Sequence, residues 1–120
     1  MNKYHTVKKN DDFYDAIHNG FYKKNSLYVI HIRNNKLDKY RLGISVSKKL
    51  GNAVHRNLYK RQIRSIIDKY KKYYQNGYDY IIILKKDFSI SSFDVKDSLY
   101  GELLLQINNH ITREINNEKF

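Results

Sequence analysis

The chain has 120 residues, with 23 Lys or Arg against 12 Asp or Glu, which gives a formal net charge of +11 and a pI of about 9.7. This length predicts one domain over residues 1–120, and the charge indicates a polyanionic partner such as RNA. The absence of cysteine excludes disulfides, Cys-ligated metal sites and thiol nucleophiles. The longest apolar run, Tyr80–Leu84, is far too short to span a bilayer, and the N-terminal residues lack the apolar core of a secretory signal. We therefore expect a cytoplasmic protein with no membrane partner.

The first half of the chain predicts one helix and two strands. Asn10, followed by two acids, is typical of a helix start, and Gly20 is the expected left-handed stop of that helix. The apolar, β-rich segment Leu27–Ile32 predicts a strand with Val29 and His31 on one face. The polar residues 34–39 predict a hairpin loop. The alternating segment Arg41–Ser47 predicts a second strand.

The second half predicts a helix, a strand and a helix, so the expected order is α-β-β-α-β-α in a small α+β fold. Asn52 is the expected N-cap of a helix from Ala53 to Tyr74. The β-branched run Tyr78–Leu84 predicts a buried strand. The last helix spans Ser92–Glu118, and Gly101 within it indicates a close packing contact. Apolar residues recur along this helix at steps of four: Leu99, Leu103, Ile107, Ile111 and Ile115.

Basic residues are concentrated in one segment. Residues 48–72 contain nine Lys or Arg and one acid, so about a fifth of the chain holds eight of the eleven net charges. A codon bias toward Lys, Asn, Tyr and Ile is one explanation of part of the total charge, but it would spread that charge along the chain. The location of the charge is therefore more informative than its amount.

The predicted helix over 53–74 has an apolar face and a separate basic face. A solvated surface is one explanation of a basic face. RNA binding is favoured here because the arginines, which bind phosphate through two parallel hydrogen bonds, are gathered on it, and because one acid alone balances the helix. The free amides at the helix start add an anion site. At about 100° per residue, five residues share an arc of about 140°: Arg56, Asn57, Lys60, Arg61 and Arg64.

The segment Arg41–Arg64 strongly resembles the signature of the bacterial ribonuclease P protein subunit. Within it, the run Gly-Asn-Ala-Val-His-Arg-Asn-Leu-Tyr-Lys-Arg-Gln-Ile-Arg at positions 51–64 corresponds to the RNR motif of that family. Residues 8–13 resemble the family's opening more loosely. The resemblance implies a two-layer sandwich of helices on a mixed sheet, with a left-handed β-α-β crossover in place of the usual right-handed one.

The resemblance also implies a function. The family binds the catalytic RNA subunit of ribonuclease P and the 5′ leader of precursor tRNA, and it assists Mg²⁺-dependent endonucleolytic removal of the leader. Mg²⁺ would be bound mainly by RNA, without strong protein ligands, and no obligate protein partner is implied. The positions expected to contact RNA are Lys49, Asn52, Arg56, Asn57, Lys60, Arg61 and Arg64.

A cleft between the first helix and the sheet is implied to hold the single-stranded leader. Relatives often carry aromatic residues where this chain has Ile17 and His31, and an aromatic ring stacked on an unpaired base contributes about 1–3 kcal/mol. His31 is therefore either a partial stacking residue or an ordinary half-buried sheet histidine. The positions expected to line the cleft are Phe13, Ile17, Val29, His31 and Ser47.

The residue spacings argue against chemistry by the chain itself. Its five histidines show no metal-ligand spacing, and its acids do not cluster as a two-metal nuclease requires. The segment Gly43–Gly51 lacks the Lys-Ser/Thr end of a phosphate-binding loop. We expect no catalytic residues here and catalysis by the RNA partner. A ribosomal or general RNA-binding protein and a stand-alone nuclease are the alternative functions.

Overall fold

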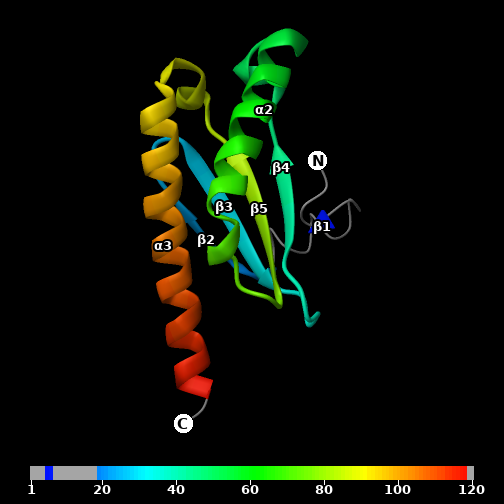
Figure 1. Cartoon of the computed structure of the whole chain (residues 1–120), viewed down its shortest axis with the longest axis vertical. Coiled ribbons are helices and arrows are strands. Elements are labelled where there is room, and N and C mark those ends of the chain that lie inside the picture. Colours follow the sequence, from blue (N-terminus) through cyan, green and yellow to red (C-terminus); the bar gives the residue numbers. More distant parts are fainter. Residues whose placement is uncertain (1–4, 7–18, 119–120) are drawn as a thin grey trace.

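Two helices lie on one face of a five-stranded sheet in the computed structural model, which describes residues 5–6 and 19–118 (Figure 1). The predicted α+β sandwich of helices on a mixed sheet is confirmed. The expected first helix after Asn10, with Phe13 and Ile17, lies outside the described residues. The strands are β1 (His5–Thr6), β2 (Phe21–Lys24), β3 (Tyr28–Asn34), β4 (Arg41–Ser45) and β5 (Tyr78–Leu84). The helices are α2 (Ala53–Lys69) and α3 (Phe93–Glu118), and short 3₁₀ helices span Lys48–Leu50, Lys71–Tyr73 and Lys86–Ile90.

The strand order is β1-β4-β5-β3-β2, with β5 at the centre. β5 lies between β4, to which it is parallel, and β3, to which it is antiparallel, so β3 and β4 do not pair with each other. The hairpin expected across residues 34–39 is therefore wrong. An almost continuously apolar strand such as Tyr78–Leu84 is stable where both of its faces are buried and a strand pairs with each of its edges. β5 therefore takes the centre of the sheet, and this separates β3 from β4.

The β4-α2-β5 unit joins two parallel strands through a helix. In Figure 1 both strands run upward, α2 lies on the viewer's side of the sheet, and β5 lies to the left of β4. The connection is therefore left-handed, against the general preference for right-handed crossovers. This is the hand that the resemblance implied.

Within residues 19–118, a hairpin instead joins β2 to β3. The side-chain oxygen of Asn25 closes its turn by accepting hydrogen bonds from the backbone N–H groups of Leu27 and Tyr28, both at 3.0 Å. The expected left-handed stop at Gly20 is wrong, because Gly20 does not have a positive φ. Glycine is required there for another reason: a Cβ would overlap the carbonyl oxygen of Ile32 in β3.

The core lies between the two helices and the face of the sheet that they cover. Ile115 breaks the expected stripe of α3 and is 39% exposed, because each step of four residues rotates a helix position by about 40° and carries the last one away from the sheet. The fully buried core residues include Tyr28, Ile30 and Ile32 of β3, Tyr80 and Ile82 of β5, Ile63, Ile66 and Ile67 of α2, and Leu103, Ile107 and Ile111 of α3.

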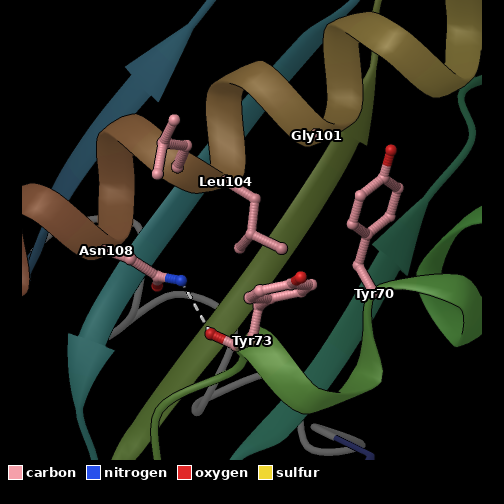
Figure 2. Close-up of a pocket in the computed structure, with 6 residues that line it drawn as sticks. Tyr70, Tyr73, Gly101, Leu104 and Asn108 are labelled. Atoms are coloured by element: carbon pink, nitrogen blue, oxygen red, sulfur yellow. Dashed lines mark hydrogen bonds between the residues drawn. The ribbon is translucent and has the colours of Figure 1, made fainter.

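α2 ends at Lys69, five residues earlier than predicted. Two tyrosines turn the chain at this point. Tyr70 packs against Gly101 of α3, where a Cβ would lie 2.7 Å from the Tyr70 hydroxyl, and Figure 2 shows the two side by side. The Tyr74 hydroxyl donates to the carbonyl of Ile67 at 3.2 Å, one of the helix-end carbonyls that lack a partner within the helix. The contact predicted at Gly101 is confirmed.

Candidate nucleic-acid interface

The start of α2 forms one end of the candidate interface. The Asn52 side-chain oxygen accepts a hydrogen bond from the His55 backbone N–H at 3.0 Å, which confirms Asn52 as the N-cap. Gly51 before it has φ of 134°, a conformation that favours glycine. The first turn carries no acid, so nothing offsets the positive end of the helix dipole. Because its side-chain oxygen is used in the cap, Asn52 has its amide nitrogen left for a ligand.

An open hollow of about 560 Å³ lies along the outer side of α2. Four residues of the predicted RNA-binding set line it, namely Asn57, Lys60, Arg61 and Arg64, and Val54 completes the lining. Val54 is 76% exposed, and its side chain was not in the predicted RNA-binding set. Its place at about 160° on the helical wheel, next to Arg61, is the signal that could have identified it.

The cations of this hollow are not neutralised by the described part of the chain. Lys60, Arg61 and Arg64 form no ion pair there, whereas Lys69 near the end of the helix binds Asp97 at 2.7 Å. Cations without carboxylate partners are available to phosphates, and binding to a polyanion then releases its counterions. The hollow is therefore suited to a nucleic-acid backbone.

Two further predicted residues lie apart from the hollow. Lys49 is exposed in the 3₁₀ helix that precedes α2. Arg56 is half-buried on the side of α2 that also carries Ile63, and its Nε is buried without a hydrogen-bond partner among the described residues. The seven predicted residues therefore form one continuous N-terminal region of α2 and its approach, but they face more than one direction.

The second candidate surface is the sheet face opposite α2 and α3, which we call the open face because neither helix covers it, although Ile81 and Gly43 on it are buried. Val29 and His31 of β3 lie on it, since Tyr28, Ile30 and Ile32 point into the core. Two rows cross the strands on this face. One joins Tyr22, His31, Ile81 and Gly43, and the next joins Lys24, Val29, Ile83 and Ser45. Ser47 is exposed just beyond the end of β4, two residues after Ser45.

Sequence reasoning missed Tyr22 and Lys24 of the open face because it did not recognise β2. The segment Phe21–Lys24 has four residues and two adjacent lysines, which is too short and too charged for a clear periodic signal. Its exposed positions are nevertheless Tyr22 and Lys24, whereas Phe21 and Lys23 are half-buried.

A third row of the open face consists of charged residues that bind one another. Asp79 is fully buried and accepts hydrogen bonds from Arg33 at 2.6 Å and from Arg41 at 2.8 and 2.7 Å, and Asn35 donates to it at 2.8 Å. Burial by itself would raise the pKa of Asp79. The hydrogen bonds from Arg41, Asn35 and Arg33 outweigh that effect and hold the pKa below its usual value. Asp79 is therefore ionised at neutral pH and holds both guanidinium groups in place.

A separate cavity of about 250 Å³ lies between the end of α2 and α3 (Figure 2). Its lining is mostly apolar, and the Asn108 side chain closes one side by donating to the Tyr73 carbonyl at 2.7 Å. The basic hollow occupies the N-terminal half of the same helix, so the two are distinct features. The cavity is lined by Tyr70, Tyr73, Gly101, Leu104, Leu105 and Asn108.

The described residues do not form a site that fits Mg²⁺. Across residues 5–6 and 19–118, no three His, Asp or Glu side chains come together as metal ligands, and the basic hollow would repel a cation. None of the helices in these ranges is long and apolar enough to cross a bilayer.

Comparisons with known proteins agree with one another. Residues 1–108 match the family model described as Ribonuclease P. The ribonuclease P protein component of Mesoplasma florum is 40% identical over 101 residues, which cover 83% of this chain and 92% of that protein. The solved RNase P protein of Staphylococcus aureus has a TM-score of 0.79 at 36% identity, covering 88% of this chain and 96% of the other. That of Thermotoga maritima has a TM-score of 0.72 at 30% identity, covering 83% and 96%.

Proposed function

The chain belongs to the ribonuclease P protein family, whose members are the protein component of the enzyme that matures the 5′ ends of tRNA, and from this premise we propose how it acts. The basic hollow of α2 binds the catalytic RNA subunit. The open face of the sheet holds the 5′ leader of precursor tRNA. The protein acts in the cytoplasm, as a subunit of the holoenzyme.

The basic hollow is the observation that carries this proposal. Asn57, Lys60, Arg61 and Arg64 gather on one side of a single helix, and none of the three cations among them is paired with a carboxylate in the described residues. A folded RNA crowds phosphates together, so fixed unpaired cations lower the repulsion among them. Asn57 adds an amide that can bond to a phosphate, a 2′-hydroxyl or a base edge.

We place catalysis in the RNA subunit. The described residues offer positioning and charge, and no three of their His, Asp or Glu side chains gather as the metal site of a nuclease requires. Mg²⁺ would be bound mainly by RNA, and neutralisation of nearby phosphates by α2 would allow the RNA to fold and act at lower Mg²⁺.

Reconstitution tests this function. The full chain is combined with a bacterial ribonuclease P RNA and a precursor tRNA, and leader release is followed as Mg²⁺ is lowered. We expect cleavage at low Mg²⁺ to require both components. Cleavage by the protein alone would instead show a nuclease, and RNA binding without any stimulation of the RNA subunit would favour a general RNA-binding protein.

A further inference from the structure

We propose that Tyr22 and Lys24 of β2 form a nucleotide subsite on the open face, where the Tyr22 ring stacks on an unpaired base of the leader and Lys24 contacts its phosphate. The inference rests on the proposed function, because it concerns the same substrate. It adds a strand that sequence reasoning did not identify, and it assigns the stacking surface to a residue outside the set predicted for the cleft.

The geometry of Tyr22 supports stacking. Its side chain is 54% exposed, although a tyrosine ring gains free energy from burial. Tyr22 pairs with His31 across β2 and β3, and the two ring centroids lie 5.5 Å apart at an angle of 45°. His31 therefore supports the Tyr22 ring from the neighbouring strand and leaves much of that ring open to a base.

This pairing bears on the role of His31, which the sequence left open. An imidazole ring offers a smaller stacking surface than a phenol ring. Here the larger ring comes from the next strand in the same cross-strand row, so stacking shifts from β3 toward the β2 edge of the sheet.

Lys24 supplies the charge. It follows Tyr22 by two residues and therefore projects from the same face, about 7 Å further along the strand, which is similar to the separation of neighbouring phosphates in an extended nucleic acid. Lys24 is exposed and has no ion pair with a described residue. A ring beside an unpaired cation is the arrangement that binds single strands without sequence preference.

The test compares precursor tRNAs that carry leaders of increasing length with the leaderless mature tRNA, all bound by the reconstituted holoenzyme. Tyr22→Ala should weaken precursor binding by about 5- to 150-fold, the range that corresponds to 1–3 kcal/mol for one stacked base. Mature tRNA should bind unchanged, and the loss should appear only above a threshold leader length. Tyr22→Phe should restore tight binding, because it keeps the ring.

Matched variants separate binding from structure. Lys24→Ala should reduce the salt dependence of precursor binding by about one phosphate contact, while Lys23→Ala, on the opposite face of the same strand, should not. Tyr73→Ala removes an equally exposed tyrosine, 50% exposed, far from the open face and should leave the preference for precursor intact.

The outcomes distinguish the two proposals. If the wild-type holoenzyme binds precursor and mature tRNA equally, the leader-binding part of the proposed function fails. If the wild type prefers precursor and Tyr22→Ala keeps that preference, or loses affinity for both tRNAs equally, the Tyr22 subsite is overturned while the proposed function stands.

Discussion

Asp79 joins the three strands at the centre of the sheet, because its carboxylate lies between Arg33 of β3 and Arg41 of β4. Its side chain is fully buried, and those of the two arginines are 12% and 19% exposed. A buried carboxylate that loses its charge leaves two confined cations without compensation. The residue therefore fixes the register of β3, β4 and β5 at one end of the open face.

Asp79→Asn should lower the free energy of unfolding by about 3–5 kcal/mol at neutral pH, the usual cost of breaking a buried ion pair. Urea unfolding measures it. Asp38→Asn, an exposed carboxylate in the loop before β4, is the control and should change stability by no more than about 0.5 kcal/mol. Equal effects of the two substitutions would contradict the assigned role of Asp79.

The same residue predicts a pH dependence. Because the folded pKa of Asp79 lies below its ordinary value of 3.8, its stabilising contribution is complete above that pH. It is lost as the pH falls through the folded pKa. The difference in unfolding free energy between wild type and Asp79→Asn should therefore stay constant from neutral pH down to about pH 4 and shrink below it. A difference that grows on acidification would refute this assignment.

At the scale of elements, α2 has two different sides: one packs against the protein core, and the other carries the basic hollow. Tyr59, Ile63, Ile66 and Ile67 are buried against the sheet and α3, while the hollow faces away from them. This division means that the basic side can be altered without disturbing the core. Binding and stability should therefore respond to different substitutions on one helix.

Arg61→Ala and Arg64→Ala should each weaken binding of the RNA subunit and reduce the slope of log affinity against log salt by about one phosphate contact. Filter binding over a salt series measures the slope. Arg113→Ala removes an arginine in the last two turns of α3 and should leave the slope unchanged, because this end of α3 and the start of α2 lie at opposite ends of the molecule (Figure 1). Unfolding by urea should be the same for all three variants.

Tyr70 joins the end of α2 to α3, because its hydroxyl donates to Asp97 at 2.6 Å. Burial and the hydrogen bond to Asp97 raise its pKa to about 12. Tyr70→Phe should lower the free energy of unfolding by about 1–3 kcal/mol, as expected for a hydrogen bond to a charged group. Urea unfolding in parallel with Gly101→Ala, which intrudes on the same ring, locates the effect at this contact.

The pH dependence at Tyr70 has the opposite sign to that of Asp79. A folded pKa raised from 10.0 to about 12 makes the contribution complete below pH 10, and it is lost as the pH rises toward 12. The stability gap between wild type and Tyr70→Phe should therefore narrow over this range in urea unfolding. A gap that remains constant to pH 12 would show that the hydroxyl does not act through its proton.

At the scale of the whole molecule, the net charge of +11 opposes the compact state through self-repulsion. Salt screens this repulsion, so added NaCl should raise the unfolding temperature of the free protein. The RNA-bound protein should respond in the opposite direction, because salt weakens the binding that stabilises it. Thermal unfolding with and without the RNA subunit, at about 0.05 M and 0.5 M salt, tests both signs.

The sequence predicted those elements whose evidence is local. β5 was predicted with the bounds that the structure shows, and α3 within one residue, because an apolar run and apolar residues at helical spacing carry their own signals. β2 was missed because four residues with two lysines carry no such signal. The end of α2 was placed too late, because the turn depends on Tyr70 meeting a glycine 31 positions away.

The arc of basic residues on α2 could be derived from helical periodicity alone, since it needs only one helix and its pitch. The open face could not be derived in this way. Whether Tyr22 stands beside His31 depends on which strands pair and in which register, and the hairpin expected from the chain order was the wrong one. Pairing is decided by contacts between distant segments, which no local pattern encodes.

The amino-acid sequence by itself therefore determined the family, the charged helix face and the bounds of β5 and α3, because each follows from residues adjacent in the chain. Only the tertiary structure decided the central place of β5, the buried Asp79 network and the aromatic row from β2 to β3. These depend on the burial of an apolar strand between two neighbours, which brings together residues as far apart as Arg33 and Asp79.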